Sequence, residues 1–273
     1  MTTALPTPTA LSLIEGNLVT YWRDLGRFPG FTLRDHPGSF SVTSGVHDAL
    51  FNAAFAQPCV DVALDVQVDL LLTAMRQVGL PFVYWVLPSA PAGLGELLEQ
   101  RGLSFVEHGT CMAMDLRPPL REVAVPADLT LQWVMDDQTE QQHVRVIRDA
   151  FEVSPEVADV LARRFTYVFG RGQDSPMQSV LGEVNGQLVG CGSLFLGAGT
   201  AGVYTVGVTP LARRRGVGAA LTRALLDLAR WRGFETAILL SSAAGLNVYR
   251  SLGFEPYGEM RQYVWLPEGE GAR

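Results

Sequence analysis

Hydrophobic and polar positions in the last third of the chain predict alternating strands and helices. Residues 201–208 are mostly small or apolar and end just before Pro210, a pattern that predicts a buried strand stopped by a proline. Apolar side chains then recur at helical spacing and predict an amphipathic helix ending near Gly233: Val217, Leu221, Leu225 and Leu228. A strand over 236–240 and a short helix before Gly253-Phe254 follow.

The loop between the first strand and the first helix has the composition of an anion site. Residues 213–218 are three arginines followed by Gly-Val-Gly. A helix start carries N–H groups without intrahelical acceptors, and glycines let a phosphate approach them. No Lys-Ser or Lys-Thr pair follows the glycines, and their spacing is not Gly-x-Gly-x-x-Gly, which excludes a P-loop and a dinucleotide fingerprint. The loop therefore predicts a pyrophosphate cradle.

The pattern Arg213-x-x-Gly216-x-Gly218, after a strand that ends in Val-x-Pro, resembles the acyl-CoA-binding motif of the GNAT acyltransferase superfamily. The resemblance covers roughly residues 128–266. It implies acetyl-CoA, or another acyl-CoA, as co-substrate, with its pyrophosphate on the loop amides and its pantetheine arm along the preceding strand. The cofactor-binding residues implied are Val206, Gly207, Val208, Arg213, Arg214, Arg215, Gly216, Val217, Gly218, Ala219 and Asn247, the last with the alternative of a helix surface residue.

A second motif lies in the helix over 244–252, whose Tyr-x-x-x-Gly-Phe ending resembles the closing helix of the same family. The resemblance implies that Tyr249 lies beside the thioester sulfur. A phenol with a pKa near 10 suits the protonation of a departing thiolate with a pKa near 8.5. Tyr249 is therefore the expected general acid, and the alternative is a ring packed into the core. Ser242 departs from the family, because many members carry an asparagine there.

The general base stays open, because the strand before the cradle offers Tyr204 and Thr205 where many family members carry a glutamate. We expect Glu183 to be a solvated strand residue before an Asn185-Gly186 hairpin turn and His143 to be a surface histidine. Water can also accept the amine's proton. The candidates by residue type are Asp136, Asp137, His143, Glu152, Glu156 and Glu183.

Composition narrows the class of protein. With 273 residues, 48% of them hydrophobic, the chain is long enough for two domains, and its net charge of −7 disfavours general binding to nucleic acids. The cysteines, Cys59, Cys111 and Cys191, have neither disulfide nor zinc-site spacing, so we expect no metal. Neither a signal peptide nor an apolar run of roughly 18 residues is recognisable, and we expect a cytoplasmic protein away from membranes.

The first half of the chain contains a faint copy of the second. Helices over 66–79 and 94–100 alternate with strands over 82–86 and 111–114. When Gly79 is aligned with Gly233, residues 59–64 lie opposite the cradle without its arginines and glycines. Leu98 lies opposite Tyr249 when Gly102 is aligned with Gly253. The copy resembles the degenerate lobe of tandem GNAT proteins.

These observations predict an α/β (α+β) fold with two GNAT-like lobes, each a mixed, mostly antiparallel twisted sheet flanked by helices. Residues 1–122 are expected to form a degenerate lobe and residues 123–273 the catalytic domain, joined by a proline-rich linker. The predicted function is acyl transfer from acetyl-CoA to a primary amine of a small molecule or peptide by direct attack. The alternatives are an acyl-CoA sensor and a mycothiol-synthase-like transferase acting on an amino sugar. The oligomeric state stays open, and a monomer is compatible with a lobe that replaces a dimer partner.

Overall fold

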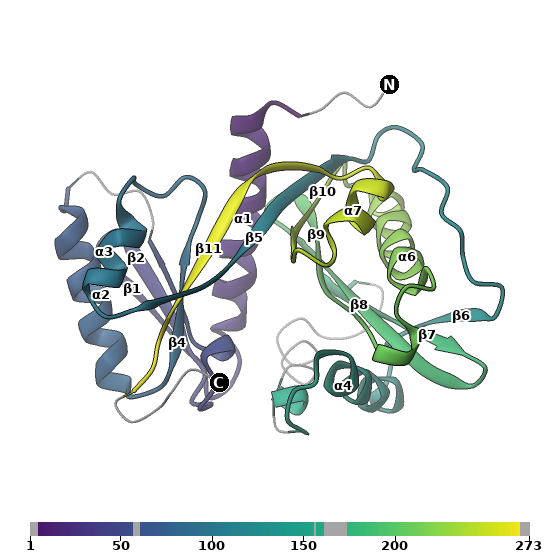
Figure 1. Cartoon of the computed structure of the whole chain (residues 1–273), viewed down its shortest axis with the longest axis horizontal. Coiled ribbons are helices and arrows are strands. Elements are labelled where there is room, and N and C mark those ends of the chain that lie inside the picture. Colours follow the sequence, from purple (N-terminus) through teal and green to yellow (C-terminus); the bar gives the residue numbers. More distant parts are fainter. Residues whose placement is uncertain (1–4, 57–60, 156, 161–173, 268–273) are drawn as a thin grey trace. The chain divides into compact units, whose positions relative to one another are not determined.

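The computed structural model describes residues 5–56, 61–155, 157–160 and 174–267 (Figure 1). The chain divides into two compact units: a large unit of residues 1–21 and 111–257, and a small unit of residues 22–110 and 258–273. Both units are discontinuous, whereas the sequence predicted contiguous halves that meet near residue 122. Hydrophobic alternation identifies a strand without specifying its neighbours in the sheet. The predicted division therefore follows the order of the sequence, whereas the units follow the contacts between elements.

The large unit contains the predicted strand–helix–strand–helix series (Figure 1). Its elements are β6 (Leu129–Trp133), α4 (Asp137–Phe151), β7 (Met177–Val184), β8 (Gln187–Gly197), β9 (Thr200–Val208), η2 (Pro210–Ala212), α6 (Val217–Trp231), β10 (Thr236–Ser241) and α7 (Leu246–Leu252). Strands β6 to β9 are antiparallel neighbours, and β10 is parallel to β9. The first part of helix α1 (Thr7–Leu25) also belongs to this unit.

Helices cover both faces of the large unit's sheet. Glycines on β7 and β8 admit α6 to one face: a methyl group on Gly190 would lie 2.9 Å from the Leu221 side chain. The next residue, Cys191, points the other way and packs with Val146 and Ile147 of α4. The main core between sheet and α6 includes Val203, Leu221, Leu225 and other fully buried side chains. The small residues of β8 therefore determine how closely α6, and with it the predicted cradle, approaches the sheet.

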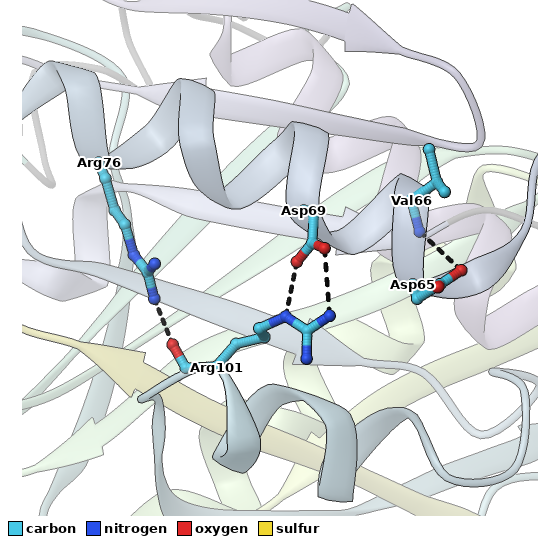
Figure 2. Close-up of polar contacts among 5 residues, drawn as sticks. All are labelled: Asp65, Val66, Asp69, Arg76 and Arg101. Atoms are coloured by element: carbon cyan, nitrogen blue, oxygen red, sulfur yellow. Dashed lines mark hydrogen bonds and ion pairs between the residues drawn. The ribbon is translucent and has the colours of Figure 1, made fainter.

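The small unit also consists of strands and helices. Its elements are β1 (Thr32–His36), β2 (Ser39–Thr43), η1 (Ala49–Phe51), β3 (Ala53–Ala56), α2 (Leu64–Val78), β4 (Phe82–Val86) and α3 (Leu94–Gln100). Arg101, just after α3, ties the two helices together: its guanidinium donates to both carboxylate oxygens of Asp69 on α2, at 2.7 and 3.1 Å (Figure 2). Its carbonyl oxygen accepts a hydrogen bond from Arg76 of the same helix.

The predicted internal repeat is present in the order of the elements. The series β3-α2-β4-α3-β5 in the first half matches β9-α6-β10-α7-β11 in the second, and the β3–β4 and β9–β10 pairs are both parallel. The final strands, β5 (Ser104–Asp115) and β11 (Glu255–Trp265), each pass from one unit into the other, and β5 is longer than the predicted strand over 111–114. Strand order is β4-β11-β5-β10, so β11 neighbours β4 and β5 neighbours β10. The two repeats thus exchange their final strands.

Candidate functional site

Strand β9 opens away from its neighbour β10 halfway along its length. The parallel pairing covers only Ala201, Gly202 and Val203. On its other edge, β9 pairs with β8 in one register from Thr200 opposite Gly197 to Tyr204 opposite Ser193. The pairing resumes in a shifted register with Gly207 opposite Cys191. Thr205 and Val206 together therefore face one residue of β8, which is a β-bulge, and Thr205 has a φ of 52°. The bulge lies where β9 leaves β10.

The opening leaves backbone groups of β9 for a ligand. The Thr209 N–H donates to the Val189 carbonyl of β8 at 2.8 Å, and the Gly207–Cys191 pair has the same orientation. Because N–H groups alternate in direction along a regular strand, the amide of Val208 points away from β8, toward the opening. Val206 belongs to the bulge and lines the pocket at the opening. Of the strand residues predicted to pair with a pantetheine arm, Val208 therefore presents its amide to the opening, whereas the Gly207 amide faces β8.

The cradle lies at the start of α6. Gly216 is the N-cap with a φ of 85°, and the first helical hydrogen bond runs from Ala220 N–H to the Gly216 carbonyl. The amides of Val217, Gly218 and Ala219 therefore precede the first intrahelical bond. A left-handed residue followed by helical ones turns successive N–H groups toward one point, a geometry that favours anions. The helix start therefore leaves three backbone amides available to an anion.

Gly216 is also needed for the fold. A methyl group there would lie 3.1 Å from the Ala124 carbonyl oxygen, and the positive φ strains any L side chain. A side chain at this position, as in Gly216→Val, should therefore lower the stability of the fold as well as obstruct the helix start. Gly218 differs, because its φ is ordinary and an added methyl group would make only a 3.6 Å contact with Val208.

The three arginines of the cradle have different surroundings. Arg213 donates through Nε to the Val208 carbonyl and through Nη2 to the Ala150 carbonyl, both at 3.0 Å, and so joins the end of β9 to the end of α4. Arg215 pairs with Asp128 at 3.0 Å. Arg214 makes neither a hydrogen bond nor an ion pair with the part of the chain that the structure describes, and it is exposed. Arg214 is thus the arginine whose charge is available to an anion.

Helix α7 brings Tyr249 to the same site. A pocket of about 380 Å³ extends from the cradle to the Tyr249 ring. Tyr249 packs edge-on against Phe254, with ring centroids 6.0 Å apart, and burial raises its pKa to about 12. A methyl group on Gly245 would lie 2.8 Å from the ring, so this glycine makes room for Tyr249. The structure therefore brings both sequence motifs into one pocket.

Most of the predicted residues line this pocket, but not all. The lining consists of Val206, Val208, Ala212, Arg213, Arg214, Gly216, Val217, Gly218, Ala219, Ser242, Ala244, Gly245, Val248 and Tyr249. Gly207, Arg215 and Asn247 do not line it. Sequence reasoning singled out Ser242 as a departure from the family pattern without assigning it to the site. The small residues at 244 and 245 line the pocket because the chain there leads from β10 into α7.

None of the base candidates among the described residues lines the pocket. Asp136 caps α4, where its side chain accepts the Thr139 N–H, and Asp137 lies in the first turn. Glu152 ends α4, 3.8 Å from Arg213, and Glu183 is a half-buried residue of β7 before the predicted Asn185-Gly186 turn. Glu156 lies outside the described residues. The general base therefore stays unassigned.

His143 contradicts its predicted position on the surface. It is 2% exposed in α4, and burial lowers its pKa to about 4. It lies on the same helix face as Val146, Ile147 and Ala150, at i, i+3, i+4 and i+7. That spacing was visible in the sequence, although the neighbouring glutamines suggested a polar surface. A buried imidazole with this pKa is a poor candidate for a general base that passes protons to solvent.

The start of α2, which the repeat aligns with the cradle, is built differently. The Asp65 carboxylate lies in the first turn and accepts the Val66 N–H at 2.9 Å (Figure 2). A first-turn amide of the kind that α6 leaves without an intrahelical partner is thus satisfied here by the chain's own negative charge. Leu98, aligned with Tyr249, is fully buried and offers no donor. Cys59 and Val60 of the aligned segment lie outside the described residues.

The residues that the structure describes contain no group of three or more His, Cys, Asp or Glu side chains that could bind a metal. Among the same residues, no helix has both the length and the apolar character needed to cross a membrane.

Comparison with known proteins points to one family. Residues 143–254 match the model of the acetyltransferase (GNAT) family. A mycothiol acetyltransferase from Renibacterium salmoninarum is 28% identical over 164 residues, which are 56% of this chain and 48% of that protein. The chain spans about half the length of the curated relatives that it matches.

Two solved structures share the fold over nearly the whole chain. A GCN5-related N-acetyltransferase from Kribbella flavida superposes with a TM-score of 0.71 at 19% identity, covering 93% of this chain and 96% of that one. A tandem GNAT protein from the clavulanic acid biosynthesis pathway superposes with a TM-score of 0.59 at 18% identity, covering 89% and 85%. The predicted fold class, a mixed and mostly antiparallel sheet flanked by helices, is confirmed.

Proposed function

Because residues 143–254 match the model of the acetyltransferase (GNAT) family, we propose that this protein transfers the acyl group of acetyl-CoA, or of a related acyl-CoA, to a primary amine. The observation that carries the proposal is the single pocket that joins the amides at the start of α6 to the Tyr249 ring. An anion site at one end and a phenol at the other match a ligand with a pyrophosphate and a distant thioester. The acceptor is a small molecule or peptide bearing an amine.

The residues of the pocket fit the acyl donor. The amides of Val217, Gly218 and Ala219 receive the pyrophosphate, and the Arg214 guanidinium adds a charge that the described part of the protein leaves unneutralised. Val206, Val208 and Val248 supply apolar walls between the cradle and Tyr249. These walls suit the pantetheine arm, which pairs with the backbone of β9 at the opening. Asn247, exposed on α7, is retained as a peripheral contact.

The chain contributes two donors to the transfer. The Val206 N–H, turned into the opening by the bulge, polarises the thioester carbonyl as a neutral amine attacks it. Tyr249 donates a hydrogen bond to the leaving sulfur. With a pKa of about 12 against about 8.5 for a thiol, complete transfer of the phenol proton is unfavourable by roughly 5 kcal/mol, so the phenol stabilises the thiolate chiefly by hydrogen bonding. The attacking nitrogen, which is positively charged in the tetrahedral intermediate, loses its proton to water as the amide forms, and water returns a proton to the departing thiolate.

The test is thiol release from acetyl-CoA across a panel of polyamines, amino acids, aminoglycosides, amino sugars and peptides. At least one amine should release thiol in a 1:1 ratio with acetylated product. Tyr249→Phe should lower kcat with little change in acetyl-CoA affinity. Saturable binding of acetyl-CoA without thiol release from any amine would refute the transferase and leave an acyl-CoA sensor.

Two alternatives keep specific support. A sensor is favoured by the lack of a carboxylate base among the described residues of the pocket. Transfer to an amino sugar is favoured by the similarity to mycothiol acetyltransferase, within the half of that protein that the match covers. The amine panel distinguishes them, because a sensor releases no thiol and an amino-sugar transferase prefers the amino sugars.

We also propose that the first half of the chain is a degenerate lobe without a cofactor. The Asp65 carboxylate on the Val66 amide supports this assignment (Figure 2). Calorimetry of acetyl-CoA binding should give one site per chain. Asp65→Ala should leave that stoichiometry unchanged.

A further inference from the structure

A fully buried asparagine on α1 joins that helix to the strands of the large unit. The Asn17 amide group donates to the carbonyl oxygens of Gly197 and Thr200, at 2.9 and 3.2 Å, and to the Thr200 hydroxyl at 3.0 Å. Its carbonyl oxygen accepts the Tyr204 hydroxyl at 2.8 Å. Both ends of the amide are therefore used, on three positions spread along β8 and β9.

The sequence around this contact is adapted to a close approach of α1. Gly202 has no side chain where one would collide with Asn17, and a methyl group on Gly16 would lie 3.8 Å from Ala198. Tyr21, one turn along α1, stacks on the Tyr204 ring with centroids 4.6 Å apart and an angle of 10°. Helix α1 thus clamps Tyr204 by its ring and by its hydroxyl.

Tyr204 lies immediately before the bulge that shapes the proposed site. It is the last residue of β9 paired with β8 before Thr205 takes its left-handed conformation, and Val206 follows. On the far side of the bulge, Gly207 lies against α4, where a methyl group would be 2.6 Å from the Phe151 ring. The two bulge residues are therefore anchored from both sides. Burial raises the pKa of Tyr204 well above its ordinary value, so its hydroxyl remains a donor.

We infer that Asn17 and Tyr204 are positioning residues, which fix the bulge in β9 so that the Val206 amide points at the acyl carbonyl. The inference rests on the proposed function, because it assigns a role within that site. Neither side chain lines the pocket, and both act through the backbone. A bulge released at Tyr204 can slide by one residue, which would turn the Val206 amide back toward β8.

The test compares two variants of the full chain that each remove one hydroxyl from the network. Tyr204→Phe removes the bond to the Asn17 carbonyl oxygen and keeps the stacked ring. Thr200→Val removes the hydroxyl that accepts a hydrogen bond from the Asn17 amide nitrogen. That nitrogen still donates to the carbonyl oxygens of Gly197 and Thr200. For Tyr204→Phe we expect a kcat about tenfold lower with the KM for acetyl-CoA unchanged within about twofold, since a displaced donor affects mainly the transition state. For Thr200→Val we expect kcat to be unchanged. The fall in Tm should be similar in the two variants, because each loses one hydrogen bond of the same network.

Amide hydrogen exchange gives a readout that does not need turnover. Exchange at residues 205–208 should quicken in Tyr204→Phe and not in Thr200→Val. Equal kcat losses in both variants would show a merely structural role and overturn the inference, as would unchanged kcat and exchange in Tyr204→Phe. If the wild-type protein releases no thiol with any amine, the proposed function fails. The exchange comparison then still decides whether Tyr204 fixes the bulge.

Discussion

Replacement of His143 by leucine should remove an acid-sensitive part of the stability of this protein. The imidazole is 2% exposed, and burial lowers its pKa from 6.5 to about 4. Between these values the unfolded chain binds a proton that the folded chain excludes. Stability contributed by the neutral imidazole is therefore complete above pH 6.5 and is lost as the pH falls toward 4. Leucine has a similar volume and no titrating group.

The size of the effect follows from the two pKa values. Proton linkage with values of 6.5 and about 4 costs the folded state about 2 kcal/mol at pH 5 relative to pH 8, and about 3 kcal/mol below pH 4. Urea unfolding of wild type and His143→Leu, followed by circular dichroism at pH 8 and pH 5, measures the difference. Between pH 8 and pH 5, the unfolding free energy of His143→Leu should rise by about 2 kcal/mol relative to that of the wild type.

Gln141→Leu is the control, because this side chain is exposed on the same helix. Its difference from wild type should be the same at both pH values. A constant difference for His143→Leu as well would show that the imidazole is charged or solvated in the folded state. His143→Leu should also keep every wild-type inflection in the pH profile of kcat/KM. Loss of an inflection near neutrality would restore His143 as the general base.

Three further outcomes test the cradle. Arg214→Gln should weaken acetyl-CoA binding about tenfold at low salt, with a smaller loss at 1 M salt, whereas Arg215→Gln should change it less because Asp128 already neutralises that side chain; isothermal titration at two salt concentrations measures both. Gly216→Ala should cost about 1–3 kcal/mol of unfolding free energy because of its positive φ, and an unchanged urea midpoint would contradict this. Gly218→Val should keep the urea midpoint and abolish acetyl-CoA binding, and retained affinity in the folded variant would remove the helix start from the site.

Sequence reasoning succeeded where local pattern determines structure. The spacing from Val217 to Leu228 gave α6, the apolar run ended by a proline gave β9, and the glycine pattern gave the helix start at Gly216. The pairing of Arg213 with two backbone carbonyls could not be predicted, because the partners lie on β9 and at the end of α4, 63 residues away for Ala150. Contacts of that range depend on the packed fold.

The contribution of the N-terminal helix was missed for the same reason. Asn17 is one polar residue among several within a helical pattern, and its partners lie 180 to 187 residues later. The glycine at position 202 was one signal, since a glycine within a buried strand indicates close approach of another element. The bulge at Thr205 left no comparable mark, because threonine rarely adopts a positive φ.

The exchange of final strands has a consequence for synthesis on the ribosome. The small unit lacks the strand that neighbours β4 until residues 258–265 have emerged, about 150 residues after the rest of that unit. At about 5–20 residues per second, this interval lasts roughly 7–30 s, during which the edge of β4 is open to incorrect pairing. A nascent chain that stops before residue 258 carries the whole proposed catalytic machinery beside an unfinished sheet. The small unit can therefore complete its fold only after the last strand has been synthesised, although all residues of the proposed site are present earlier.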